Sequence, residues 1–308
     1  MRKKLKALLI VVCAASLHTQ LRAQYYYYND RYYDNAVVFE LGASGGIMNC
    51  LTDLGGNKGI GKKFIKDLNW KNTRPSFGVY LLANYEDKLA LRLEGTFGEV
   101  MAYDSILKDV AATTTGRYER NLSFKSRISE VQLALEVHPL MFRKFDDDDP
   151  PRFSPYAIAG AGYFSFDPKA KLGGTWYSLQ PLRLEGQGFK EYPDRKPYKL
   201  NQINIVSGIG VKYQISPMFN ARLEFVHRTL FTDYLDDVSL DSYIDPSLFN
   251  NYLTPAQAAV AQQLYQRKSE ITPEEPATSI NERGDPKNND SYFSFQFKLG
   301  MILGRQRR

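Results

Sequence analysis

Three residues in the second half of the chain have the types that a hydrolase or an acyltransferase needs. Ser239 could serve as a nucleophile, His227 as its general base and Asp236 as the group that orients the base. No nucleophile motif surrounds any serine, however, and His227 falls inside a segment that alternates like a strand. The sequence therefore favours a rim histidine beside a polar loop, and we expect no catalytic residue.

Clustered aspartates suggest a second kind of chemistry, because hard cations prefer several carboxylate oxygens. Asp146–Asp149 form one cluster, and Asp233, Asp236 and Asp237 form another. Neither has the spacing of an EF-hand loop. For the first we expect a solvated acidic turn, and for the second turn fixing by Asp side chains is favoured over ion binding. We predict no metal site and no cofactor.

The glycine-rich stretch Gly55–Lys63 has a faint likeness to a phosphate cradle. It lacks the Lys-Ser/Thr ending of the Walker motif, and no nucleotide-binding fold surrounds it in the sequence. We interpret it as a flexible basic loop on the outside of the fold.

Charged residues also stand at alternate positions inside otherwise apolar segments. They are Glu40, Arg92, Glu94, Glu136, Lys212, Arg222, Glu224 and Lys298. Buried charge survives only when it is paired and hydrogen bonded, and here the two signs nearly balance. The repeated Arg-Leu-Glu at 92–94 and 222–224 suits stacked layers of ion pairs. We expect a structural role for these charges in preference to ion conduction or proton relay.

The elements that carry these charges are eight segments of roughly ten residues each between Val37 and Leu303. Each segment has one apolar face and one face of small, polar or charged side chains. The fourth, for example, sets Val131, Leu133 and Leu135 against Glu, Gln and Ala neighbours. Alternation at period two is typical of a strand whose faces lie in different surroundings.

The fifth segment follows the same rule with larger side chains. Its bulky face is formed by Tyr156, Ile158, Phe164 and Phe166, and its other face by Ala157, Ala159, Ala161 and Tyr163. We expect the bulky face of every segment, this one included, to point outward.

Volume decides which face lies inside. The bore of an eight-stranded barrel is just wide enough for side chains to fill it. The apolar stripes hold more bulk than such a bore accepts, whereas the opposite faces are rich in Gly, Ala and Ser. The sequence therefore predicts an all-β fold, an eight-stranded antiparallel transmembrane β-barrel of the outer membrane with paired charges in its interior.

Aromatic residues near the ends of the apolar stripes fit this fold, because outer-membrane barrels carry aromatic girdles at both interfaces. We expect Tyr85, Tyr156, Tyr213 and Phe219 at one rim and Phe77, Phe97 and Phe166 at the other.

The connections differ between the two ends of the expected barrel. Glu86–Lys88 and Ser216–Pro217 are very short turns, whereas the links after the first, third, fifth and seventh strands are long. Short periplasmic turns and long extracellular loops are the usual polarity. In the last long loop, Thr254 as N-cap and Pro255 in the first turn predict a short helix, Ala256–Lys268, which could rest on the barrel mouth as a lid.

The first residues predict export. Residues 1–23 have a basic head, a short apolar run and Ala23 before the expected cut, which is typical of a cleaved signal peptide. Its removal takes five basic residues and no acids, so the formal net charge falls from +6 to +1 and nucleic-acid binding loses its support. Cys50 then remains as the only cysteine, without a partner for an internal disulfide.

We accordingly divide the chain into four parts. These are a signal peptide (1–23), an aromatic N-terminal tag (24–36), a single eight-stranded outer-membrane barrel (37–304) and a basic tail (305–308).

Several strings between Val37 and Leu303 are recognisable. The most specific are the Glu-Gly-Gln-Gly loop at 185–188 and a loop motif made of Thr232, Asp233, Tyr234, Leu235, Asp236 and Asp237. Strings at 154–170, 174–182, 208–213 and 283–292 accompany them. Together they resemble the PorG-like outer-membrane β-barrel family of Bacteroidota, one member of which belongs to the type IX protein secretion system.

The resemblance implies a non-enzymatic barrel that anchors or contacts the periplasmic ring of that secretion machine. Its partners would be outer-membrane lipids, lipopolysaccharide and periplasmic ring proteins, with no nucleic acid. A stand-alone envelope-organising or adhesion barrel is the main alternative. A narrow transporter fits less well because paired charges would fill the bore, and a lipid-modifying enzyme would need the residues at 227, 236 and 239.

Overall fold

The computed structural model describes residues 32–33, 36–56, 68–114, 116–143, 151–273, 283–303 and 306–307. The predicted signal peptide, most of the aromatic tag, the Asp146–Asp149 turn and most of the Gly55–Lys63 loop lie outside these residues.

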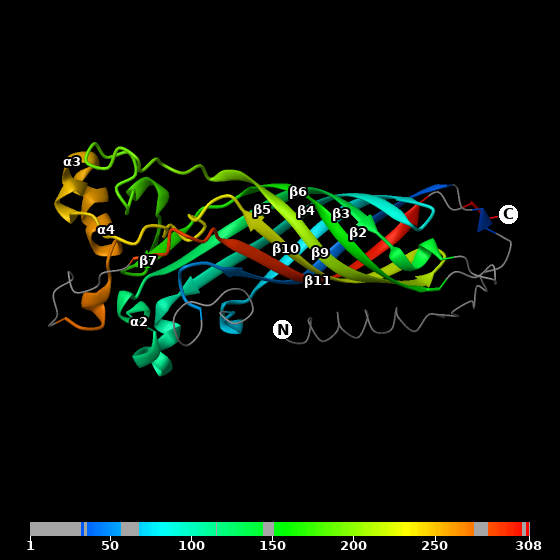
Figure 1. Ribbon diagram of the computed structural model, residues 1–308, viewed down its shortest axis with the longest axis horizontal. Coiled ribbons are helices and arrows are strands. Elements are labelled where there is room, and N and C mark those ends of the chain that lie inside the picture. Colours follow the sequence, from blue (N-terminus) through cyan, green and yellow to red (C-terminus); the bar gives the residue numbers. More distant parts are fainter. Residues whose placement is uncertain are drawn as a thin grey trace, which may run out of the picture. The chain divides into compact units, whose positions relative to one another are not determined.

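Eight antiparallel strands close into a barrel (Figure 1). Their bounds are β2 (Val37–Leu51), β3 (Arg74–Tyr85), β4 (Leu89–Tyr103), β5 (Ser123–Val137), β6 (Phe153–Ser165), β9 (Asn201–Ser216), β10 (Phe219–Leu230) and β11 (Ser291–Leu303). Strands that follow one another in the list pair with one another. β11 pairs with β2, and that pairing closes the ring. The predicted eight-stranded antiparallel barrel is therefore confirmed.

The alternation along the strands sorts side chains between the inside and the outside of the barrel. In β10, Arg222 and Glu224 are buried and Leu223 between them is 46% exposed. In β4, Arg92 is buried between the exposed Leu91 and Leu93. The apolar stripes thus face outward as predicted, in every barrel strand except β6.

The prediction for β6 is wrong. Tyr156, Ile158, Phe164 and Phe166 are buried in the interior, and the outward face carries Ala157, Ala159, Ala161 and Tyr163. The neighbouring strand explains the reversal, because the residues of β9 opposite Tyr156 and Ile158 are glycines, Gly210 and Gly208. A Cβ atom on Gly210 would lie 2.5 Å from Cζ of Tyr156, so the missing side chains make room for the large ones.

This reversal also removes two residues from the predicted girdles. Tyr156 and Phe166, the latter just past the end of β6, are buried. The other predicted girdle residues are exposed, namely Tyr85, Tyr213 and Phe219 at one rim and Phe77 and Phe97 at the other.

Short turns join β3 to β4 and β9 to β10 at one end of the barrel, together with a longer link that contains η4 (Pro139–Phe142). In the β3–β4 turn, Glu86 and Asp87 have φ of +48° and +55°, and the Lys88 amide donates to the carbonyl of Tyr85 over 3.0 Å. Positive φ at both central residues is the geometry of a tight hairpin turn.

The four long loops gather at the opposite end (Figure 1). They contain η2 (Trp70–Asn72), η3 (Asp104–Thr113), α2 (Arg117–Arg120), β7 (Lys169–Leu172), β8 (Thr175–Ser178), η5 (Gln180–Leu182), η6 (Pro246–Leu248), α3 (Phe249–Tyr252), α4 (Pro255–Leu264) and η7 (Lys268–Glu270). The hairpin β7–β8 was not predicted, and it extends the sheet beside β5.

The predicted helix is present as α4, and its start agrees with the sequence signals. Thr254 and Gln257 form a reciprocal capping box, with Pro255 in the first turn. The helix ends at Leu264 instead of Lys268, because the chain then turns so that the side chains of Gln266 and Lys268 are buried.

A separate small unit pairs β1 (Tyr32–Tyr33) with β12 (Gln306–Arg307) in an antiparallel sheet. These strands belong to the predicted aromatic tag and basic tail. Among the described residues, no helix is long and apolar enough to cross a membrane.

Candidate functional site: the barrel interior and the loop cap

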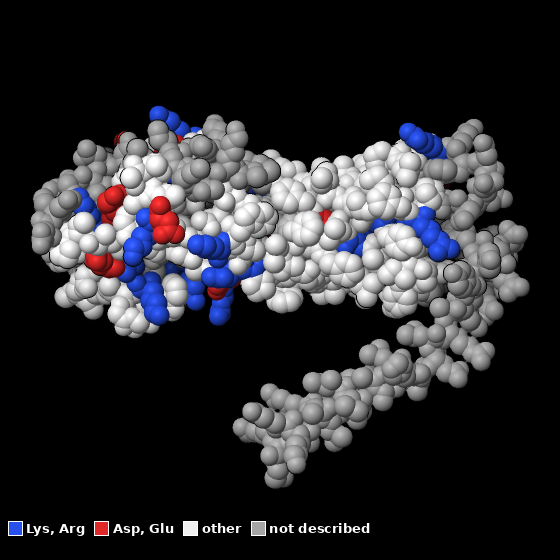
Figure 2. Space-filling model, turned by 90° about the horizontal axis from the view of Figure 1, so that it is seen from below, with Lys and Arg blue, Asp and Glu red and all other residues white. Residues whose placement is uncertain are grey.

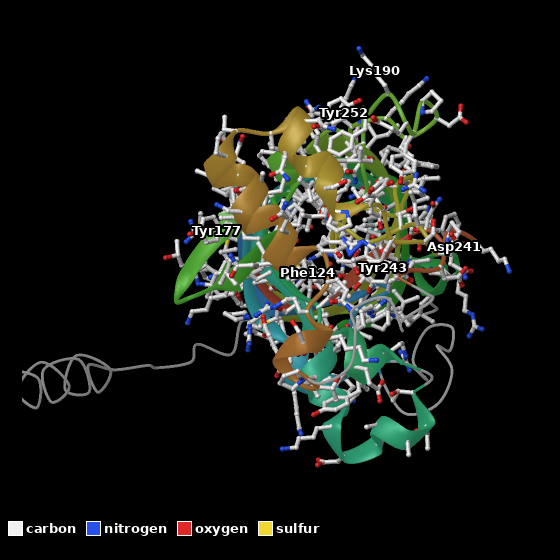
Figure 3. The ribbon with its side chains drawn as sticks, turned by 90° about the vertical axis from the view of Figure 1, so that its left-hand side faces the viewer. Phe124, Tyr177, Lys190, Asp241, Tyr243 and Tyr252 are labelled. Atoms are coloured by element: carbon white, nitrogen blue, oxygen red, sulfur yellow. The ribbon has the colours of Figure 1, made fainter. Side chains whose placement is uncertain are left out.

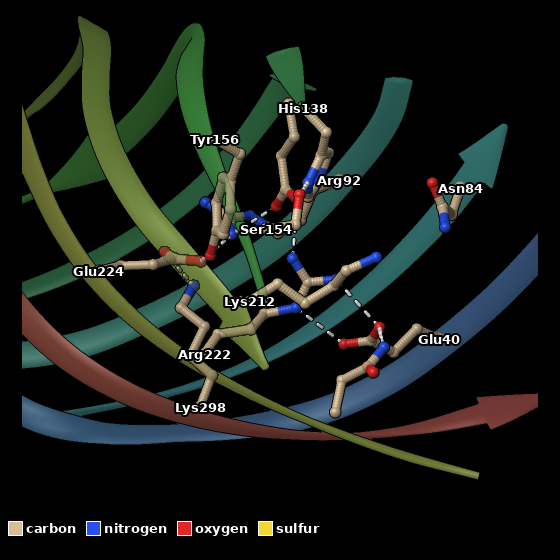
Figure 4. A network of polar contacts seen from close by, with 12 residues as sticks. Glu40, Asn84, Arg92, His138, Ser154, Tyr156, Lys212, Arg222, Glu224 and Lys298 are labelled. Carbon is tan, nitrogen blue, oxygen red and sulfur yellow. Dashed lines mark hydrogen bonds and ion pairs between the residues drawn. The ribbon is translucent and has the colours of Figure 1, made fainter. Parts of the chain in front are cut away.

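The barrel interior near the short turns is built around Arg222 of β10 (Figure 4). Its guanidinium lies 2.9 Å from a carboxylate oxygen of Glu40 on β2 and 2.8 Å from one of Glu136 on β5. Asn220 and Tyr80 donate further hydrogen bonds to Glu40, over 2.7 and 2.6 Å. One cation thus holds two carboxylates from strands on different sides of the bore.

The next layer toward the loops centres on Arg92 of β4. Its Nη1 lies 2.7 Å from Glu136 and 2.5 Å from Glu224, and its Nε lies 3.1 Å from Glu94. Lys298 of β11 then bridges Glu94 and Glu224, over 2.5 and 3.0 Å. All of these side chains have no solvent exposure, so the layer is a closed polar core.

A third layer was missed from the sequence. Arg228 of β10 lies 3.0 Å from Glu130 of β5, and Asn204 donates to the same carboxylate over 2.7 Å. The alternation of β10 carries on past His227 and places Arg228 inside, as it does Arg222 and Glu224. Continuing the alternation by one more step would have found this pair.

At the turn end, Lys212 has a different partner from the glutamates that the sequence suggested. Its Nζ lies 2.7 Å from Asp87, which the β3–β4 turn places beneath the interior. Together with the layers above, this pair leaves the opposite charges in the bore nearly balanced.

A serine, a histidine and a glutamate also meet at this end. His138 Nδ1 lies 2.9 Å from the hydroxyl of Ser154, and its Nε2 lies 3.5 Å from Glu136 (Figure 4). The types are those of a nucleophile relay. Ser154 is fully buried, and Glu136 is engaged by Arg92 and Arg222, so this arrangement suits packing better than attack on a substrate.

At the loop end the polar interior gives way to an apolar core that continues into the loops. The loops pack into one structure, here called the cap, which comprises the described parts of residues 52–73, 104–122, 166–200 and 231–290. Its rings stack in pairs, with Phe189 and Tyr252 at 4.2 Å and Tyr198 and Tyr234 at 4.8 Å between centroids. Seen from the loop end, Tyr243 lies near the middle of the cap, and Lys190 and Tyr177 lie toward its margins (Figure 3).

The helix α4 belongs to this core. Its residues Ala258, Ala261 and Leu264 are buried in the cluster that also contains Phe249 and Leu235. The helix predicted to rest on the barrel mouth therefore packs into the cap through these residues.

Three of the recognisable sequence strings meet at one buried junction in the cap. Arg283 Nε lies 3.1 Å from Glu185, and Arg283 Nη2 donates to the backbone carbonyl of Asp237 over 3.1 Å. Glu185 in turn accepts from the amides of Ser239 and Leu240, over 3.0 and 3.1 Å. The junction ties the β6–β9 loop to both halves of the β10–β11 loop.

A second junction fastens the remaining loops. Asp104 accepts from Arg120 Nε over 2.8 Å and from the amides of Gly55 and Leu122, each over 3.0 Å. Arg120 also donates to the backbone carbonyl of Arg283. The β2–β3 and β4–β5 loops are thereby joined to the β10–β11 loop.

The loop motif at 232–237 lies between these junctions. Asp236 accepts from the amides of Leu54, over 3.1 Å, and Val238, over 2.9 Å; the second contact is the side-chain turn that Asp favours. Asp237, at φ +66°, accepts from the Tyr198 hydroxyl over 2.6 Å. Thr232, Asp233 and Leu235 are buried, and Tyr234 is partly buried.

The aspartates of the cap have unusual proton affinities. Burial raises the pKa of Asp53 to about 6. Burial, with the neighbouring charges of Asp53 and Asp236, raises the pKa of Asp233 to about 9. Burial also raises the pKa of Asp237 to about 7, although Arg283 works against it. Acids outnumber bases in this part of the cap, and protonation of the aspartates reduces the excess of negative charge.

No group of three or more His, Cys, Asp or Glu side chains within the described ranges is placed to hold a metal ion. The three residues considered for catalysis have other surroundings. His227 lies on the outward side of β10, opposite Ser207 and Phe293. Asp236 is engaged by loop amides, and the amide of Ser239 binds Glu185.

The sequence matches no protein-family model, and it matches no curated protein. Among solved structures, the chain is similar to the attachment invasion locus protein Ail of Yersinia pestis, with 8% identity, a TM-score of 0.35 and coverage of 87% of this chain and 97% of that chain. The N-terminal β-barrel domain of OprF from Pseudomonas aeruginosa has 9% identity and a TM-score of 0.34, with coverage of 87% of this chain and 98% of that chain. Neisserial surface protein A has 9% identity and a TM-score of 0.35, with coverage of 85% of this chain and 96% of that chain. These likenesses concern the fold only.

Proposed function

We propose that the protein is an integral, non-enzymatic barrel of the outer membrane that serves as a structural or anchoring component of a type IX protein secretion system. The localisation rests on the outward stripes. Large apolar side chains such as Phe77, Leu91, Leu133, Ile209 and Phe297 are about half exposed or more around the wall. Contiguous apolar surface of this extent needs lipid around it.

The filled interior supports a role without transport. Salt bridges between strands across the bore occupy its middle, and removing one partner would leave an uncompensated buried charge. A barrel whose wall meets lipid and whose bore is filled can offer partners only its two ends.

The observation that carries the proposal lies at the short-turn end, which would face the periplasm. There, Phe142 in η4 is 56% exposed, beside the exposed Arg143. A large exposed ring flanked by a cation is typical of a contact residue in a protein interface. We therefore assign the periplasmic ring contact to η4.

The test is affinity purification of the tagged protein from native membranes after mild cross-linking. We expect periplasmic ring proteins to co-purify with the native chain and to be lost with Phe142→Asp. The matched control is Phe231→Asp at the loop end, since Phe231 is also 56% exposed.

Ring proteins that co-purify equally with both variants would place the contact elsewhere. Their absence from the native sample would contradict the secretion role and leave the stand-alone envelope-organising or adhesion barrel as the better account.

A further inference from the structure

Among the described strand ends, the outward surface above the apolar stripes is basic beside β5 and the hairpin β7–β8. On β5 the outward residues after Ser129 are Arg127 and Lys125, and the hairpin β7–β8 beside them adds Lys169 and Lys171. At the loop ends of β9, β10 and β11 the outward residues are instead uncharged, namely Asn201, Thr229 and Ser291. On the face in Figure 2, Lys and Arg side chains lie over the loop end with Asp and Glu side chains among them, and a further group of Lys and Arg side chains lies toward the opposite end of the wall.

These four cations, together with Trp176, are called the basic rim. Lys125 and Lys169 lie directly opposite each other across the β5–β7 pairing. Like charges in this position destabilise a sheet unless an anion lies between or beside them.

Nearby acids neutralise the rim only in part. Lys169 lies 2.9 Å from Asp167, and Lys125 lies 4.0 Å from Glu99. Arg127 and Lys171 are exposed and form no ion pair with the part of the chain that the structure describes. The rim therefore carries positive charge that is available to an external anion.

A tryptophan lies within the rim. Trp176 of β8 is opposite Lys171 and is 41% exposed, and Lys125 Nζ lies 4.0 Å from the centre of its ring. An amphipathic ring beside lysines is the usual composition of a membrane–water interface.

The height of the rim matches a lipid headgroup. Phe97, the last exposed large apolar residue of the outward stripe of β4 toward the loops, is paired with Ser129. At about 3.4 Å per residue along a strand tilted by about 40°, Arg127 lies about 5 Å and Lys125 about 10 Å above Ser129 along the membrane normal. Acyl chains lying against Phe97 and Val131 would place their headgroup at the rim.

We propose that the basic rim binds the phosphate of a phosphorylated lipid headgroup in the outer leaflet. Arg127 and Lys171 supply the unpaired charges, Lys125 and Lys169 flank them, and Trp176 packs against the lipid at the interface. The proposal rests on the proposed membrane position of the wall.

The chain has two tryptophans, so Trp70→Phe leaves Trp176 as the only indole. This variant, reconstituted in phosphatidylcholine bilayers, would be titrated with lipid A and with lipid A whose phosphates have been removed. We expect a saturable change in Trp176 fluorescence with the phosphorylated lipid. Arg127→Gln and Lys171→Gln should each weaken the affinity for the phosphorylated lipid about fivefold. Lys190→Gln, at an exposed position of the cap, should leave this affinity unchanged.

A nitroxide lipid in the same bilayers separates this proposal from the membrane placement. Failure of the nitroxide to quench Trp176 would contradict the placement of the wall itself. Quenching with equal response to both forms of lipid A would overturn only the phosphate site. Equally tight binding of soluble inositol hexakisphosphate would also overturn it, because the ligand would then be a soluble polyanion.

Discussion

Arg283 and Glu185 lie 98 positions apart in the sequence and form a buried ion pair, with Nε 3.1 Å from Oε1. The pair stands where two long loops meet, and backbone amides occupy the same carboxylate. The loops beyond the strands are consequently a packed structure with a defined surface.

Breaking this pair should open the cap and leave the barrel intact. In Arg283→Met, Glu185 keeps its charge without its cation, which costs about 3–5 kcal/mol for a buried pair. We expect rapid protease cleavage within Leu253–Thr272 in intact cells, where the native chain resists. Lys190→Met is the control. Equal resistance of Arg283→Met would show that the junction does not hold the cap.

The stability of the barrel should depend on Arg222 in the bore, as the stability of the cap depends on Arg283. Arg222→Met leaves Glu40 and Glu136 without this partner, so we expect the free energy of unfolding to fall by about 3–5 kcal/mol in urea titrations of the reconstituted protein. The exposed control is Lys88→Met, whose surface pair with Glu86 is screened by solvent, so this variant should change the free energy of unfolding little. Similar losses in both variants would contradict a structural role for the interior charges.

The cap should loosen as the pH rises. Burial raises the pKa of Asp53 to about 6, of Asp237 to about 7 and of Asp233 to about 9, from an ordinary value of 3.8. A raised pKa stabilises the fold fully below the ordinary value, and this contribution is lost as the pH passes through each folded-state value. Hydrogen-exchange protection of the cap amides should therefore fall between about pH 5 and about pH 9.

Asp233→Asn should flatten this dependence, because the amide carries no charge at any of these pH values. The exposed Asp241→Asn should keep it. If hydrogen-exchange protection of the cap in the native chain rises with pH, the raised pKa values of these aspartates are refuted.

The reversed face of β6 leads to a prediction that depends on depth. Ala159 lies at the middle of the outward face of β6, so Ala159→Arg places a charge in the lipid and should cost about 2–4 kcal/mol. Thr229→Arg, near the loop end of β10, should cost at most about 1 kcal/mol. Equal unfolding free energies for the two variants in bilayers would mean that Ala159 does not face lipid.

The sequence predicted most of the barrel because alternate residues of a strand match the different surroundings of its two faces. Arg222, Leu223 and Glu224 lie where the alternation placed them. In β6 both faces carry apolar residues, so the face that points inward is decided by Gly208 and Gly210 in the neighbouring strand. The pattern within the β6 segment alone does not contain this information.

The cap was beyond sequence reasoning for a related reason. One junction joins Glu185, Asp237 and Arg283. The other joins Asp104 and Arg120 to the backbone of Gly55 and Arg283. In both cases the relative positions of the loops follow only after the barrel closes. The strings at 185–188, 232–239 and 283–286 were recognisable one by one, but nothing in the sequence indicated that they meet.

The orientation of the strands is tested most directly by quenching with nitroxide-labelled lipids. In a background without cysteine, a fluorescent label at Leu91→Cys or Leu223→Cys should be strongly quenched in bilayers, and a label at Asp241→Cys should not. Unquenched labels at 91 and 223, on protein that stays dissolved without detergent, would contradict the account.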